Sequence, residues 1–91
     1  MPLYVGVHKA PGLQQEEFAL NAADILSSPY AQFQEIRANI KEGFILSFWE
    51  SESVENVVAE FERAGFPHQE VHEMTMVIDR AKFEQLASGQ G

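Results

Sequence analysis

The sequence predicts a single α+β domain in which two helices cover one face of a four-stranded antiparallel sheet. The chain has 91 residues, of which 45% are apolar and 22% charged, as expected of one globular domain. Segments with strand and helix periodicity alternate between turn signals in the order β-α-β-β-α-β, which is typical of ferredoxin-like folds. We expect this domain to span residues 1–79, and residues 80–91 to add a short helix and a frayed tail.

The first half of the chain predicts a strand, a helix and a second strand. Residues 3–8 alternate apolar side chains with others, and Ala10-Pro11-Gly12 ends this pattern. Residues 14–27 repeat apolar side chains at helical spacing. Ser28-Pro29 ends the predicted helix, because the residue before a proline avoids the α conformation. Residues 33–40 alternate again as a strand.

The second half predicts a strand, a helix and a last strand. Gly43 closes a hairpin turn, and residues 44–50 are the most hydrophobic run, which is typical of an interior strand. Ser53 is the expected N-cap of the following helix, and Gly65 is its expected C-cap. Residues 71–78 form the last predicted strand.

Side-chain parity divides the predicted sheet into a face under the helices and an open face. We expect the buried side to hold Leu3, Val5, Val7, Phe18, Ile25, Phe44, Leu46, Phe48, Val57, Phe61, Met74, Met76 and Ile78. The open face would then carry Tyr4, Gly6, His8, Phe33, Glu35, Arg37, Asn39, Ile45, Ser47, Trp49, Val71, Glu73, Thr75 and Val77. On the second helix, Glu55, Glu60 and Glu62 are expected to point outward. A one-residue slip of the last strand would exchange Glu73 for His72.

An open face with this many large apolar side chains predicts a homodimer through that face. The net charge of −8 argues against nucleic-acid binding, which needs a basic face, and against an anionic membrane surface. Without an apolar run of membrane-spanning length or a basic leader, a cytoplasmic protein is expected. The absence of Cys removes disulfides, thiolate metal sites and cysteine nucleophiles.

The titratable residues predict one candidate metal site. His8 ends the first strand, so we expect it near Glu73 of the last strand, or near His72 in the slipped register. Imidazole and carboxylate together suit nickel, zinc, copper or iron. Glu70, His68 or a partner subunit would have to supply further donors. The alternative is a surface histidine–carboxylate hydrogen bond with no metal.

A small-molecule pocket is a second possibility on the same face. Tyr4, Asn39 and Trp49 are the candidates to line it, with His8 beside them. No organic cofactor is predicted, since the chain has neither a phosphate-binding glycine loop nor a dinucleotide fingerprint.

Four short stretches resemble a family of small ferredoxin-like domains of the dimeric α+β barrel type, which includes nickel-binding members. They are Met1-Pro2-Leu3-Tyr4-Val5 running to His8, Pro11-Gly12, Phe48-Trp49-Glu50 and Arg63-Ala64-Gly65-Phe66-Pro67. The resemblance extends over residues 1–79 and implies the fold, a dimer and a nickel site to which His8 carries over. The chain departs from the family at Glu60, where a histidine is frequent, and at Glu35-Ile36-Arg37-Ala38-Asn39.

Three functions therefore stay open. The first is a dimeric domain that binds a divalent transition metal, nickel before others. The second is a small enzyme similar in fold to cofactor-free monooxygenases, which is an analogy of fold alone. The third is a plain interaction module.

Overall fold

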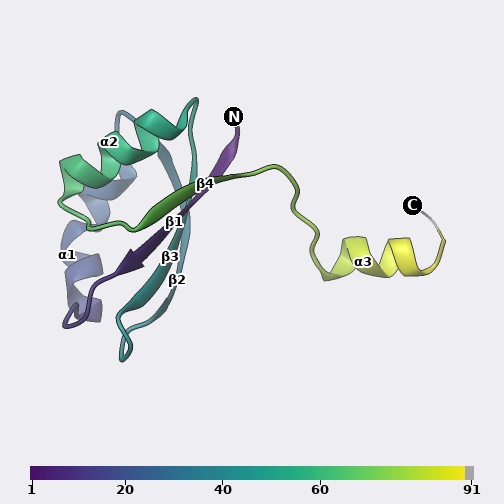
Figure 1. The fold of residues 1–91 in the computed structure, drawn as a ribbon, viewed down its shortest axis with the longest axis horizontal. Coiled ribbons are helices and arrows are strands. Elements are labelled where there is room, and N and C mark those ends of the chain that lie inside the picture. Colours follow the sequence, from purple (N-terminus) through teal and green to yellow (C-terminus); the bar gives the residue numbers. More distant parts are fainter. Residues whose placement is uncertain (90–91) are drawn as a thin grey trace.

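The computed structural model describes residues 1–89 and shows an α+β fold with a four-stranded antiparallel sheet (Figure 1). The strands lie in the order β2-β3-β1-β4, so β1 and β3 are central and β2 and β4 form the edges. Their bounds are β1 Leu3–Lys9, β2 Gln32–Asn39, β3 Phe44–Glu50 and β4 Glu70–Met74. The helices are α1 Gln15–Leu26, α2 Val54–Ala64 and α3 Arg80–Ala87.

Helices α1 and α2 lie on one side of the sheet, whereas α3 lies apart from it, beyond a segment that continues from β4 (Figure 1). The expected short helix at 80–87 is confirmed by α3. The frayed tail expected at its end falls partly on residues 90–91, outside the described residues. Within the described part of the chain, no helix is both long and apolar enough to cross a membrane.

The local end signals of α2 and of the hairpin are confirmed. The Ser53 hydroxyl accepts a hydrogen bond from the Asn56 backbone N–H at 3.1 Å and so caps the start of α2. Gly65 ends that helix with a left-handed backbone at φ 66°, and Gly43 takes φ 70° in the hairpin turn. Helix α1 starts after Gln14 without a side-chain cap.

The last strand ends four residues earlier than predicted. β4 stops at Met74, which lies opposite Leu3 at the start of β1. The next position, Thr75, would have to pair with Pro2, which has no backbone N–H to donate. The expected core position Met76 is consequently 72% exposed.

The predicted assignment of sheet faces is wrong for β1, β3 and β4, where the two faces are exchanged. On β2 a register shift between Phe33 and Glu35 moves Phe33 to the helix side and leaves Glu35, Arg37 and Asn39 on the uncovered side, as predicted. Tyr4, His8 and Trp49 are buried under the helices, together with Ile45 and Ser47. Their aliphatic and aromatic neighbours point to the uncovered side, and Phe44, expected in the core, is 40% exposed. We call this uncovered surface the open sheet face; its apolar residues are Leu3, Val5, Val7, Phe44, Leu46, Phe48 and Met74.

Close packing explains why the helices cover the Tyr4 side. The Phe61 ring of α2 lies directly over Gly6, at a distance where a Cβ would meet the ring at 2.6 Å. The same ring packs edge-on against His8 and Trp49, at centroid distances of 4.7 and 5.7 Å. Gly6 and Ser47 are small, so this face makes room for an aromatic ring that the aliphatic face would exclude.

Candidate functional site

His8 sits at the centre of a buried polar cluster under α2. Its ring is fully buried, with Nδ1 2.7 Å from the Pro67 carbonyl oxygen and Nε2 2.7 Å from the Ser47 hydroxyl. The ring also stacks on Phe66, with centroids 3.8 Å apart and planes 3° apart. The Trp49 indole N–H donates to the same Ser47 hydroxyl at 2.8 Å.

These contacts assign the proton on His8. The Pro67 carbonyl can only accept, so His8 Nδ1 carries the hydrogen and donates it. Nε2 is then the acceptor, and the Ser47 hydroxyl donates to it while accepting from Trp49. In this neutral tautomer every polar atom of the cluster has a partner.

The surroundings keep His8 neutral. Burial lowers the pKa of the imidazole below its usual value, and the nearby His68 ring lowers it further, against an opposing contribution from the Pro67 carbonyl. Both ring nitrogens are engaged, so a metal could reach Nε2 only by displacing the Ser47 hydroxyl. The cluster stabilises the core in this arrangement and offers no free ligand atom.

The expected approach of His8 to Glu73 or His72 is wrong in the observed register. Glu73 lies opposite Tyr4 and His72 lies opposite Val5, toward the other end of β1. Within residues 1–89, no group of three or more histidine and carboxylate side chains is placed to hold a metal ion.

Burial raises the pKa of the Tyr4 hydroxyl, and the charges of Glu73 and Glu55 raise it further.

The other proposed donors lie on different surfaces. His72 projects from the open side of β4, where its Nε2 lies 2.9 Å from Glu70 Oε1, and both side chains are exposed. His68 precedes β4 and packs against the Phe61 ring at a centroid distance of 5.3 Å. The structure therefore pairs His72 with Glu70 and leaves His8 and Glu73 apart from them.

The three residues expected to line a small-molecule pocket do not converge. Tyr4 and Trp49 are neighbours across β1 and β3, but both are buried in the core against Val57 and Phe61. Asn39, on β2, pairs with Phe44 at the far end of β3 from Trp49. Its side-chain amide N–H donates a hydrogen bond to the Glu42 carboxylate in the hairpin turn at 3.0 Å.

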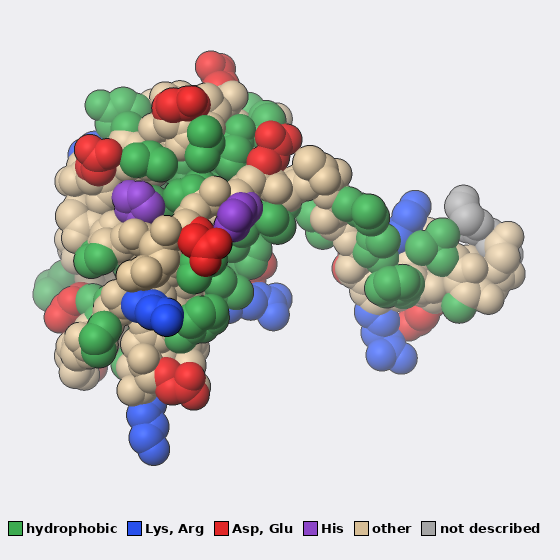
Figure 2. Space-filling view, viewed as in Figure 1, with side chains coloured by type: hydrophobic (Ala, Val, Ile, Leu, Met, Phe, Trp, Pro, Cys, Tyr) green, Lys and Arg blue, Asp and Glu red, His purple; other side chains and the backbone are tan. Residues whose placement is uncertain are grey.

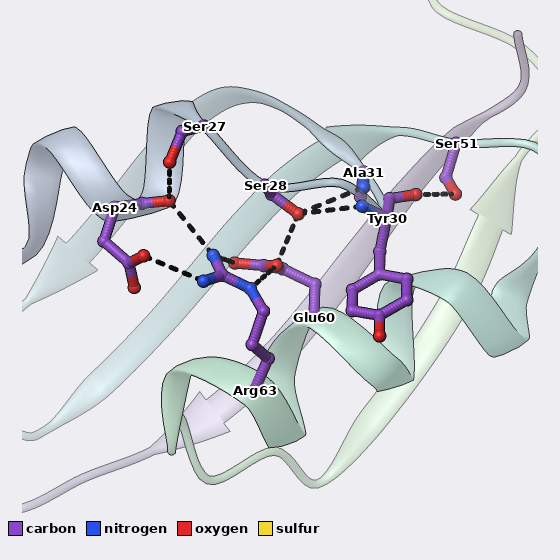
Figure 3. Close-up of polar contacts among 8 residues, drawn as sticks. All are labelled: Asp24, Ser27, Ser28, Tyr30, Ala31, Ser51, Glu60 and Arg63. Atoms are coloured by element: carbon purple, nitrogen blue, oxygen red, sulfur yellow. Dashed lines mark hydrogen bonds and ion pairs between the residues drawn. The ribbon is translucent and has the colours of Figure 1, made fainter.

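A second buried polar cluster, which sequence reasoning missed, joins α1 to α2 (Figure 3). Glu60 was expected to point outward, yet its side chain is fully buried. Arg63 grips this carboxylate with two hydrogen bonds, of 2.8 and 2.9 Å, and Ser28 donates a third to it. Arg63 also bonds the Asp24 carboxylate at 2.8 Å and the Asp24 carbonyl at 3.0 Å.

The geometry of this cluster is that of a structural clamp. Arg63 satisfies a backbone carbonyl near the end of α1 and neutralises the buried Glu60 of α2, so it holds the two helices together. The hydrogen bonds that Arg63 donates to Glu60 and Asp24 raise the pKa of its guanidinium, which is charged in any case. The available sequence signal was spacing: Glu60 lies three residues after the buried Val57 and three before Arg63.

Comparison with known proteins shows the fold alone. No protein-family model and no curated protein matches the chain. Among solved structures, the chain is similar to that described as "Crystal structure analysis of SCO4226 from Streptomyces coelicolor A3(2)", with a TM-score of 0.73 and 24% sequence identity. The match covers 84% of this chain and 99% of that one.

Proposed function

We propose that the protein is a homodimeric interaction module of ferredoxin-like fold, in which the open sheet face packs on that of a second copy. One observation carries the proposal: the side of β1 and β3 that faces away from α1 and α2 carries the apolar side chains of Leu3, Val5, Val7, Phe44, Leu46 and Phe48, and no helix covers it (Figure 1). An apolar sheet face left in water is unfavourable, and a second sheet is the usual way to cover it.

The distribution of charge on the open sheet face fits an interface. Its apolar residues occupy the middle of β1 and β3, while charged side chains such as Lys9 and Glu50 stand at the strand ends. On the edge strand β2, Arg37 and Glu35 form an exposed ion pair at 3.1 Å. An apolar centre within a charged rim is the common anatomy of a stable interface, which should bury about 1,000 Å² or more.

The net charge supplies an independent check. Each chain carries −8, so two copies repel one another and apolar burial has to exceed that repulsion. Salt screens the repulsion over a Debye length of about 8–10 Å. We therefore expect the dissociation constant of the dimer to decrease as the salt concentration rises from about 0.05 to about 0.5 M.

Light scattering and sedimentation on a Phe48→Glu variant test the interface. Phe48 lies at the centre of the open sheet face opposite Val5, and a buried charge there would oppose association. Trp49, which the sequence places on the open face, belongs to the core instead. Leu20→Glu is the matched control, because Leu20 is 83% exposed on α1 and the charge change is the same.

We expect the native protein and Leu20→Glu to have twice the 10.2 kDa chain mass at micromolar concentration, and Phe48→Glu to have the chain mass. A native protein of 10.2 kDa, or a Phe48→Glu variant as dimeric as the control, would contradict the proposal.

A divalent transition-metal site, nickel before others, is the second candidate. The observation that favours it is the exposed pair of His72 and Glu70, whose atoms stand 2.9 Å apart on the open side of β4. Two donors give a weak site, and a facing second copy would have to supply more. Calorimetry with nickel should show heat for the native protein and for His68→Ala, and none for His72→Ala. Absence of heat with the native protein would rule this site out.

A further inference from the structure

In the part of the chain that the structure describes, the segment after β4 leads away from the sheet, and α3 lies apart from α1, α2 and the four strands (Figure 1). We call residues 75–87 the arm; it comprises a linker, residues 75–79, and α3. Hydrophobic side chains are exposed over much of this part of the molecule (Figure 2). They include Met76, Val77, Phe83 and Leu86, which are between 42% and 72% exposed.

Helix α3 is well formed although it is short. The Asp79 carboxylate accepts from the Lys82 backbone N–H at 2.9 Å and caps it, and Arg80 pairs with Glu84 at 2.7 Å. Isolated helices shorter than about 12–15 residues are marginal in water, so eight residues need a surface to pack on. Phe83, Leu86 and Ala87 share one side of α3 at i, i+3 and i+4 spacing, which is the pattern of a helix that docks in a groove.

A groove of matching character runs between α1 and the edge strand β2. It is an apolar hollow of about 480 Å³. Its lining is Phe18, Ala19, Ala22, Ile25, Leu26, Phe33, Glu35 and Ile36. Leu26 at its rim is 72% exposed. We call it the α1–β2 groove.

We infer that the arm of one copy crosses to the second copy and packs α3 into that copy's α1–β2 groove. This inference rests on the proposed homodimer and says which further surfaces of the two copies meet. Three observations support it: the direction of the arm, the length of its linker and the charges of the two helices.

The direction of the arm excludes its own groove. The arm leaves from β4, whereas the groove lies at β2 on the opposite edge of the sheet. In Figure 1, α1 and α3 stand on opposite sides of the sheet. The arm therefore extends toward the side that the open sheet face looks to, where the second copy is proposed to lie.

The linker has the length that this crossing needs. Five extended residues span up to ~17 Å, and two sheets packed face to face lie ~10 Å apart. A linker of this length reaches past the edge of the second sheet, toward the side on which that copy's α1 and α2 lie.

Charge also favours this pairing of helices. α1 contains Glu16, Glu17 and Asp24 and no basic residue. α3 contains Arg80 and Lys82 and one acidic residue, Glu84, so it carries a net charge of +1 against −3 for α1. Docking α3 beside α1 thus brings basic side chains to an acidic helix.

Inter-chain disulfide formation tests the contact directly, because the native chain has no cysteine. A full-length Leu86→Cys chain is mixed with a differently tagged Leu26→Cys chain and oxidised. The matched control replaces Leu26→Cys by Leu20→Cys, which is also on α1 and exposed but does not line the groove. We expect the mixed disulfide in the first mixture and at least about tenfold less in the control. Equal yields, or no mixed disulfide with Leu26→Cys, would overturn the inference.

The dissociation constant separates this inference from the proposed function. Phe83→Glu with Leu86→Glu removes the apolar side of α3, and should raise the constant at least about 100-fold, since burial of each side chain is substantial. Ala81→Glu with Gln85→Glu adds the same charge on the opposite side of α3 and should change it less than about threefold. If both double variants dimerise like the native protein while Phe48→Glu does not, the arm inference fails and the homodimer stands. If the native protein is a monomer, the proposed function itself fails.

Discussion

The close approach of the Phe61 ring of α2 to Gly6 makes Gly6→Ala the sharpest test of which sheet face the helices cover. A Cβ on residue 6 would lie 2.6 Å from Phe61 Cζ, 2.8 Å from Phe61 Cε2 and 2.8 Å from His8 Nε2. Gly6 does not have a positive φ, unlike the four glycines that do among residues 1–89. Alanine therefore brings no backbone strain here, and its effect comes from packing.

The expected loss of stability is the sum of opposing contributions. Alanine in place of a strand glycine would by itself stabilise the fold by about 0.5–1 kcal/mol. Non-bonded carbons prefer 3.5–4.0 Å, so the Phe61 ring has to retreat by about 1 Å, and overpacking of this kind costs about 1–3 kcal/mol. Displacing His8 Nε2 weakens its bond to Ser47 and costs about 1 kcal/mol more. We expect a net decrease in the free energy of unfolding of about 1–3 kcal/mol.

Urea unfolding followed by tryptophan fluorescence measures this change, because Trp49 is the single tryptophan and packs 5.7 Å from Phe61. Phe61→Ala alone should cost about 3–5 kcal/mol. In the double variant Gly6→Ala with Phe61→Ala, the new methyl group enters the space left by the ring. The decrease in its free energy of unfolding should therefore be smaller than the sum of the two single decreases, by about 1–2 kcal/mol.

Whether Gly6→Ala lowers or raises the free energy of unfolding decides which side of the sheet the helices cover. If the helices covered Leu3, Val5 and Val7, Gly6 would lie on the open face and alanine would stabilise the protein. A Gly6→Ala variant as stable as the native protein, or more stable, would therefore refute the packing described above.

Three further predictions concern the buried polar clusters. The pKa of His8 is lowered in the folded state, so the unfolded chain takes up the proton first as the pH falls. The stability that neutral His8 provides is therefore complete above pH ~7.5. It is lost as pH falls through ~6.5, by at most ~1.4 kcal/mol per pH unit. Urea unfolding between pH 8 and 5 should show this slope, and His8→Asn should reduce it; an unchanged slope would contradict the assignment. Ser47→Ala leaves the Trp49 N–H and His8 Nε2 without their partner and should cost about 1–3 kcal/mol by urea unfolding at neutral pH, whereas a neutral effect would argue against the cluster. Arg63→Met strands the buried Glu60 carboxylate and should cost about 3–5 kcal/mol, while Arg63→Met combined with Glu60→Met should recover much of that loss; equal instability of both variants would show that helix packing, and not the unpaired charge, is responsible.

The sequence was sufficient for the elements because each depends on local chemistry. The Ser53 cap, the left-handed glycines at 43 and 65 and the strand alternation all act within a few residues. The end of β4 could not be predicted from the sequence, because the strand ends where its next partner would be Pro2, which is remote in the sequence and adjacent in the sheet. Glu60 was misplaced for a similar reason, because its carboxylate becomes buried and meets Ser28 only when α1 packs on α2.

The error in the sheet faces has a different origin, and it bears on the proposed function. Residues 44–49 of β3 are apolar on both sides, apart from Ser47, which is the pattern of a strand buried on both faces. Apolar content alone does not determine which of two such sides the helices cover. The side of Gly6 and Ser47 is covered because these small residues leave space for the Phe61 ring. A strand of this kind requires three layers of structure, whereas α1, α2 and the sheet supply two. If a second copy supplies the third layer, the feature that made the faces ambiguous in the sequence is the same feature that makes the chain associate.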